Sequence, residues 1–200
     1  MIGRIKDTLE HALERIAPML PRNPNLLTVI GLLVSLLSIP IALIKQYPIL
    51  LPIIILASGF FDAVDGLSAR FNKMVSNSGA FLDSALDRFE DSAIIMAVAV
   101  LSGLNTIIMV EAYTAVVGSL LTSYMRARAE SLGLRMLGIG FFERPERLIY
   151  LFALTLIYAL IRSSAVLTYG MGIFALITLA TAIQRTIVAY RLLKENKHQQ

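Results

Sequence analysis

The sequence has 200 residues, of which 56% are hydrophobic and 16% are charged, with a formal net charge of +4 and a mean hydropathy of +0.72. A soluble domain of this length cannot bury so much apolar surface, so the composition indicates lipid as the surrounding solvent. The chain has no cysteine and only two histidines, both near the termini, which excludes disulfides and thiolate metal sites and argues against a histidine-built catalytic site.

The first 22 residues predict an amphipathic helix lying in the membrane interface. Apolar side chains recur every three or four positions from Ile2 to Leu20, with charged residues between them. Because no uninterrupted apolar stretch occurs here, the segment is not a signal peptide. An ordinary amphipathic helix docked on protein is the alternative interpretation.

Six apolar segments follow, and we expect each of them to cross the bilayer. They cover residues 26–44, 49 to about 70, 79–101, 106–130, 148–161 and 165–190. The sequence therefore predicts an all-α integral membrane fold: an interfacial helix at 1–22, a six-span domain at 23–193 and a polar C-terminal tail at 194–200.

Basic residues are distributed unequally between the two sides of these spans. All 18 lysines and arginines except Lys45 and Arg162 fall on the termini and on the loops after the second and fourth spans. The positive-inside rule then predicts a multi-pass protein of the cell membrane with both termini and the aspartates described next in the cytoplasm. The same rule accounts for the basic charge, so we expect no nucleic-acid partner.

Four aspartates flank the loop between the second and third spans. Asp62 and Asp65 share one helix face, and so do Asp83 and Asp87, because residues three or four apart are neighbours on a helix. The short connection sets the two helices antiparallel, so the pairs can converge. Converging carboxylates repel one another and lose hydration unless they hold a divalent cation, and hard oxygen ligands suit Mg²⁺, Mn²⁺ or Ca²⁺ rather than zinc.

Small residues lie between the two pairs. Gly66, Ala69 and Gly79 would let a bulky ligand approach the helix backbone closely. A simpler interpretation is that acids only mark the ends of two spans. It accounts for Glu90 and Asp91, but not for two paired sets of aspartates with small residues between them.

The stretch from Asp62 to Asp87 reads D-x2-D-G-x2-A-R-x8-G-x3-D-x3-D. This pattern resembles the signature of the CDP-alcohol phosphotransferases at every specified position, and an interfacial helix followed by six spans is that family's architecture. Members transfer a lipid phosphate from a CDP-linked lipid to an acceptor alcohol and release CMP. The resemblance implies a phospholipid-biosynthesis enzyme that uses CDP-diacylglycerol or CDP-archaeol, sits among membrane lipids and forms a homodimer.

The resemblance also implies residue roles. Asp62, Asp65 and Asp83 are expected to ligate metal, with Asp87 both near the metal and acting as the general base. Two Mg²⁺ or Mn²⁺ ions are expected. The nucleotide-binding positions are expected to be Asp62, Gly66, Ala69, Arg70, Gly79 and Asp83, together with Asn25 and Thr28. A plain helix start explains those last two residues equally well.

The acceptor alcohol is predicted from arginines near the later spans. Arginine binds phosphate oxygens bidentately, so a phosphorylated acceptor should need several of them. The segments around these arginines resemble the inositol-phosphate branch, in which basic residues receive the acceptor's phosphate. The predicted phosphate-binding residues are Arg126, Arg144, Arg147 and Arg185.

Alternatives remain open for these arginines and for the acceptor. Charge flanking a span explains most basic residues, although Arg185 has apolar neighbours on its C-terminal side, and only the resemblance favours Arg126 over Arg128. Arg144 and Arg147 each follow a glutamate, so an ion-paired loop is a second interpretation. Glycerol phosphate or another alcohol is the alternative acceptor, and an ion-coupled transporter is the alternative that is not an enzyme.

Overall fold

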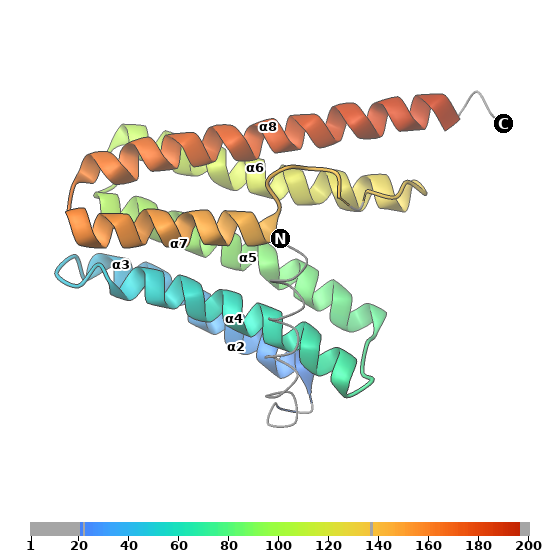
Figure 1. Cartoon of the computed structure of the whole chain (residues 1–200), viewed down its shortest axis with the longest axis horizontal. Coiled ribbons are helices and arrows are strands. Elements are labelled where there is room, and N and C mark those ends of the chain that lie inside the picture. Colours follow the sequence, from blue (N-terminus) through green and yellow to red (C-terminus); the bar gives the residue numbers. More distant parts are fainter. Residues whose placement is uncertain (1–20, 22, 137, 197–200) are drawn as a thin grey trace, which may run out of the picture.

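The computed structural model describes residues 21, 23–136 and 138–196, and all regular structure within these ranges is α-helical (Figure 1). The predicted interfacial helix, residues 1–22, lies outside the described residues apart from position 21. The helices are α2 (Pro24–Leu36), α3 (Ser38–Leu43), α4 (Leu50–Phe71), α5 (Asn77–Ser102), α6 (Thr106–Ser131), α7 (Arg144–Ile161) and α8 (Ser164–Asn196). The all-α prediction is confirmed.

Helices α2 and α3 form one apolar rod with a local irregularity at Leu37. Pro40 has no N–H to donate to the carbonyl of Leu36, so the regular helical ladder is broken at this point. The N–H of Leu37 is shared between the carbonyls of Leu33 at 3.2 Å and Val34 at 3.1 Å. Together the two helices give 20 residues of high mean hydropathy.

Among the described residues, four helical rods are long and apolar enough to cross a membrane: Pro24–Leu43, Leu50–Phe71, Thr106–Ser131 and Ser164–Glu195. Helix α5 has 26 residues, but its first half carries the charged positions that precede an apolar second half. Helix α7 has 18 residues and begins with charged residues. The structure therefore supports a helical membrane protein.

The rods pack side by side around a shared apolar core (Figure 1). Helices α6 and α8 run along each other, α2 packs on α4, and α5 and α7 lie between these pairs. Gly118 permits the close approach of α6 and α8, because a Cβ at this position would lie 2.9 Å from the backbone nitrogen of Leu179.

Helix α7 begins at Arg144, four residues before the predicted start of the fifth span. Pro145 lies in the first turn, where its missing N–H has no helical partner to lose, so it favours this start rather than blocking it. The extension puts Arg144 and Arg147 three residues apart on the same helix face.

Helix α8 continues to Asn196, beyond the predicted end of the sixth span at Tyr190. Its last turns pack on a small second core made by the end of α6 and the α6–α7 connection, with Leu192 and Leu193 against Leu134 and Met136. The connection before α7 is therefore attached to α8.

Candidate active site

The α4–α5 turn brings the two aspartate pairs together, as the spacing predicts. Helix α5 starts at Asn77 because the Ser76 hydroxyl caps it, accepting a hydrogen bond from the N–H of Gly79 at 3.1 Å. One carboxylate oxygen each from Asp62, Asp83 and Asp87 lies within 4.8 Å of the other two. Three partly buried carboxylates this close fit a divalent cation.

Asp65 stands beside this carboxylate trio rather than in it. The side chain is buried, and its Oδ2 has no hydrogen-bond partner in the described part of the chain. The Oδ1 of Asp83 is a second buried oxygen without a partner among the described residues. Buried polar atoms normally find a partner, so two orphaned carboxylate oxygens at one place also fit a metal ligand set.

The charge balance points the same way. Six carboxylates gather at this end of α4 and α5: Asp62, Asp65, Asp83, Asp87, Glu90 and Asp91. Among the described residues, three guanidinium groups pair with these carboxylates, those of Arg144 and Arg147 on α7 and that of Arg88 on α5. Within the described ranges the group therefore keeps an excess of negative charge, which a divalent cation would neutralise.

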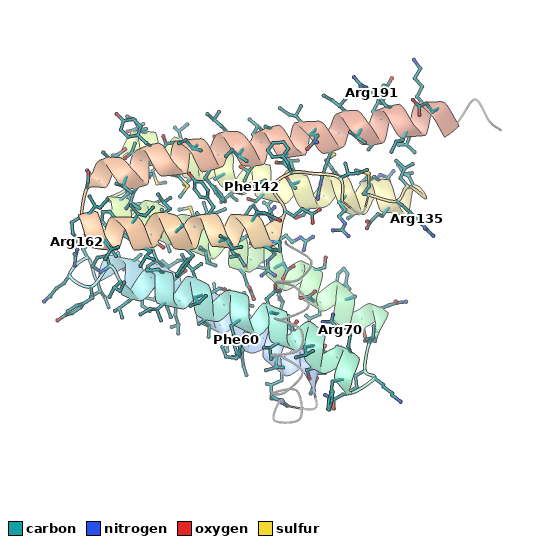
Figure 2. The ribbon with its side chains drawn as sticks, in the orientation of Figure 1. Phe60, Arg70, Arg135, Phe142, Arg162 and Arg191 are labelled. Carbon is teal, nitrogen blue, oxygen red and sulfur yellow. The ribbon has the colours of Figure 1, made fainter. Side chains whose placement is uncertain are left out.

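A cavity of about 310 Å³ opens next to the trio. It is lined by seven of the eight predicted nucleotide-binding residues, namely Asn25, Thr28, Gly66, Ala69, Arg70, Gly79 and Asp83, and also by Asp65. Arg70 lies toward the end of α4, beside the start of α5 (Figure 2). Asp62, the remaining predicted position, lies in the trio and does not line the cavity.

The small residues keep this cavity open. Of the described side chains, a Cβ on Gly66 would meet that of Arg70, at 3.7 Å from its Nη1, so a methyl group would project into the space without a clash there. Asn25 and Thr28 line the cavity and also belong to the start of α2, where the Thr28 hydroxyl donates to the Pro24 carbonyl at 3.2 Å. The two interpretations of these residues are therefore compatible.

A second cavity, of about 160 Å³, lies between α5, α6, α7 and α8. All four arginines predicted to bind the acceptor's phosphate line it: Arg126, Arg144, Arg147 and Arg185. Asp87 lines the same cavity, so this residue connects the carboxylate trio with the arginines. Arg128 is not among its lining residues and donates to the Ser131 hydroxyl at 3.4 Å, which favours Arg126 over Arg128.

Arg144 crosses from the second cavity to the trio. Its Nη1 contacts Asp62 and lies 2.7 Å from the Oδ1 of Asp87, while its Nη2 donates to the Oε2 of Glu90 at 2.7 Å. Arg144 and Arg147 are therefore ion-paired, as the alternative interpretation expects, but they lie in a helix rather than a loop, and their partner carboxylates are on α4 and α5.

Arg185 is almost fully buried, with 3% of its surface exposed. Its Nε donates to the Ile139 carbonyl at 2.7 Å, its Nη1 to the Thr122 carbonyl at 2.8 Å, and its Nη2 to the Oε1 of Glu143 at 2.7 Å. The side chain therefore fastens the α6–α7 connection and α6 to α8. Gly140 makes room for it, since a Cβ there would lie 2.7 Å from the Arg185 Nε.

Glu90 and Asp91 are site residues that the sequence interpretation missed. The view that they only mark the end of a span is wrong, because they are 3% and 7% exposed and both form ion pairs with α7. A signal was present in their spacing. They follow Asp87 by three and four residues, which places them on the helix face that Asp87 occupies.

Known proteins resemble the whole chain. The family model described as CDP-alcohol phosphatidyltransferase matches residues 22–190. The archaetidylinositol phosphate synthase of Pyrococcus horikoshii is 36% identical over 197 residues, which are 97% of this chain and 99% of that protein. The phosphatidylinositol phosphate synthase of Cutibacterium acnes is 37% identical over 134 residues, covering 64% of this chain and 62% of the relative.

Solved structures of one relative share the fold. The phosphatidylinositol phosphate synthase of Mycobacterium tuberculosis with CDP-DAG bound superposes with a TM-score of 0.70 at 28% identity, over 94% of each chain. The same enzyme in complex with manganese and citrate gives a TM-score of 0.72 at 27% identity, over 92% of this chain and 88% of that one.

Proposed function

The chain belongs to the CDP-alcohol phosphatidyltransferase family and is a phosphotransferase enzyme, and we propose that it transfers the phosphatidyl-type group of a CDP-linked lipid to an inositol phosphate with release of CMP. One observation carries the choice of acceptor: four arginines line a single cavity that also contains Asp87. Each of the four also pairs with a carboxylate, and a bound phosphate, unlike a neutral alcohol, would offer these guanidinium groups further charged oxygens.

The CDP-linked lipid is proposed to place its nucleotide in the 310 Å³ cavity, which is therefore named the nucleotide cavity. Support comes from the lining by Gly66, Ala69 and Gly79 and from the relative whose structure holds CDP-DAG. Archaeal relatives are named archaetidylinositol phosphate synthases and bacterial ones phosphatidylinositol phosphate synthases, so either ether-linked or ester-linked lipid is compatible with the chain. Both lipids share the pyrophosphate at which the reaction takes place.

We assign the metal to the carboxylate trio, with Asp65 as a further ligand. Two ions, Mg²⁺ or Mn²⁺, are proposed, and a relative whose structure is in complex with manganese supports the use of a divalent cation. A divalent cation held by these residues would neutralise negative charge on the pyrophosphate and on the departing CMP. The orphaned oxygens of Asp65 and Asp83 are the oxygens of this chain that such an ion would satisfy.

The protein's own side chains are proposed to divide the remaining tasks. Asp87 accepts the proton of the acceptor hydroxyl as that oxygen attacks the β-phosphorus of the CDP-lipid. The bond between this phosphorus and the oxygen of CMP breaks, so one phosphate ester forms as the pyrophosphate bond is lost. The four arginines hold the acceptor's own phosphate, which fixes the hydroxyl beside Asp87.

The finer topology is proposed as six spans after an interfacial helix, with the active site in the cytoplasm and the protein acting as a homodimer. The second half of α5 and most of α7 are apolar and lie between rods that can cross a membrane, which supports counting them as spans. Arg70, Arg135 and Arg191 lie toward one end of the bundle, and Arg162 lies at the other (Figure 2).

The deciding experiment is an acceptor panel. Purified protein is given CDP-diacylglycerol or CDP-archaeol, Mg²⁺ or Mn²⁺, and one of inositol phosphate, glycerol phosphate, free inositol or serine, and CMP release is measured. We expect inositol phosphate to give the highest kcat/KM. Preferred use of glycerol phosphate would replace the proposed acceptor with the alternative, and release with free alcohols alone would remove the assignment of the four arginines.

A further inference from the structure

Two adjacent acids on α5 hold the two arginines at the start of α7. The Oε2 of Glu90 accepts from the Nη2 of Arg144 at 2.7 Å and from the Ser58 hydroxyl at 3.2 Å. The Oδ2 of Asp91 accepts from the Nη2 of Arg147 at 2.6 Å, and its Oδ1 lies 3.5 Å from the Nε of Arg144. Each acid thus accepts a hydrogen bond from the Nη2 atom of one arginine.

Glu90 lies between helices and away from both cavities. Ser58 of α4 donates to it, and on the α2 side a Cβ added to Gly31 would lie 3.2 Å from its Oε1. Glu90 is 3% exposed. It lines neither the nucleotide cavity nor the 160 Å³ cavity between α5, α6, α7 and α8, which is named the arginine cavity after the four arginines that line it. Its hydrogen-bond partners are Ser58 and Arg144, and of these two Arg144 lines the arginine cavity, so we expect an effect of Glu90 on the reaction to act through Arg144.

A buried carboxylate at this place requires an explanation. Burying a charge is unfavourable, and a well-packed apolar residue often stabilises a fold as well as or better than a buried ion pair. Packing alone therefore does not account for Glu90. The ion pair between Glu90 and Arg144 does restrict the arginine side chain. Arginine has many rotamers, and fixing one of them before the ligand arrives reduces the conformational entropy lost on binding.

Each of the two guanidinium groups has an N–H donor that is unpaired among the described residues. Arg147 is 3% exposed, and the Nε atoms of Arg144 and Arg147 are buried without a hydrogen-bond partner in the described ranges, although both residues line the 160 Å³ cavity. Buried donors normally bind an acceptor. Oxygens of a bound phosphate would provide acceptors of the kind that arginine recognises.

We propose that Glu90 and Asp91 are positioning residues that fix Arg144 and Arg147 for the acceptor's phosphate and so determine the KM for the acceptor. This inference rests on the proposed function, because it takes the arginine cavity as the acceptor site. Asp87 supplies the base on one face of α5, and the next turn of the same helix orients the groups that bind the acceptor.

The test compares Glu90→Gln and Asp91→Asn with the unchanged protein, using CDP-diacylglycerol and inositol phosphate. Hydrogen bonds to charged groups correspond to roughly tenfold or more in affinity, so the KM for inositol phosphate should rise by about that factor. The KM for the CDP-lipid should stay within about twofold. Titration calorimetry with inositol phosphate, without CDP-lipid, should show the same weakening of binding, and Glu90→Asp should recover part of it.

Glu111→Gln is the matched control. Glu111 is an acid in α6 that packs close to Gly172 and takes part in none of the ion pairs of the described residues. The same Glu→Gln exchange there should leave both KM values unchanged. An increase equal to that of Glu90→Gln would show a general response to losing a membrane-embedded acid, and the inference would fail.

The outcomes separate the two proposals. If the unchanged protein releases CMP only with unphosphorylated alcohols, the proposed function fails and this inference fails with it. If it uses inositol phosphate but both variants keep its KM and only lose thermal stability or kcat, Glu90 and Asp91 are structural and only the inference is overturned. Should Glu90→Gln not fold, Ser58→Ala removes a single bond to Glu90 and should raise the acceptor KM about threefold. An unchanged KM in that variant would also overturn the inference.

Discussion

Replacing Arg185 with alanine is the most informative single perturbation, because this side chain combines a cavity position with three strong hydrogen bonds. The bonds go to the carbonyls of Ile139 and Thr122 and to the carboxylate of Glu143, at 2.7–2.8 Å. A bond from a charged donor contributes about 1.5–3 kcal/mol. Water from the adjoining cavity can rehydrate the freed acceptors, so we expect a loss of about 3 kcal/mol rather than the full sum of the three bonds.

That loss should appear in two measurements. The thermal unfolding midpoint in detergent should fall by roughly 6–12 °C for a chain of this size. The KM for inositol phosphate should rise about tenfold, corresponding to about 1.4 kcal/mol, since a guanidinium that lines the cavity is removed and the α6–α7 connection is released. The KM for the CDP-lipid should change by less than about twofold, because Arg185 does not line the nucleotide cavity.

Arg162→Ala provides the matched control at the opposite end of the bundle (Figure 2). Arg162 also donates to two backbone carbonyls, those of Lys45 and Gln46, both at 3.1 Å. Its loss should lower stability by about 1 kcal/mol and leave both KM values unchanged. An Arg185→Ala enzyme with an unaltered acceptor KM, or with both KM values raised equally, would refute the reasoning.

Three further predictions concern the proposed general base, the nucleotide cavity and the metal. Asp87→Asn should lower kcat by about 10²–10⁴ while binding of CDP-lipid, measured by calorimetry, persists; near-normal turnover would remove Asp87 as the base. Gly66→Ala should stabilise α4 by up to about 1 kcal/mol, because alanine favours a helix, yet raise the KM for the CDP-lipid several-fold, since the methyl group enters the cavity. An unchanged CDP-lipid KM would show that the cavity is not the nucleotide site. Chelation should abolish CMP release and added Mn²⁺ or Mg²⁺ should restore it, whereas activity that survives chelation contradicts a metal at the carboxylate trio.

Much of the fold could be predicted because its signals are local. The turn at Gly103 between α5 and α6 follows from a glycine that adopts a φ of +102°, and apolar stretches of spanning length predict helices directly. The sequence predicts the start of α7 four residues too late, because a run of charged residues with Pro145 resembles a loop. In the first turn of a helix, however, proline loses no hydrogen bond, and the charged side chains there find partners on other helices.

For the candidate site too, the features that depend on local signals could be predicted and those that depend on helix packing could not. The sequence by itself determined the apolar, membrane-type composition, the facing aspartate pairs and the small residues that line the 310 Å³ cavity, because composition and helical spacing act over a few residues. Only the tertiary structure decided which arginines pair with which carboxylates. Arg144 and Asp62 are 82 positions apart, and Arg147 and Asp91 are 56 apart, so their contact depends on how whole helices pack. Helical periodicity states which face a side chain occupies, but not which helix that face will meet.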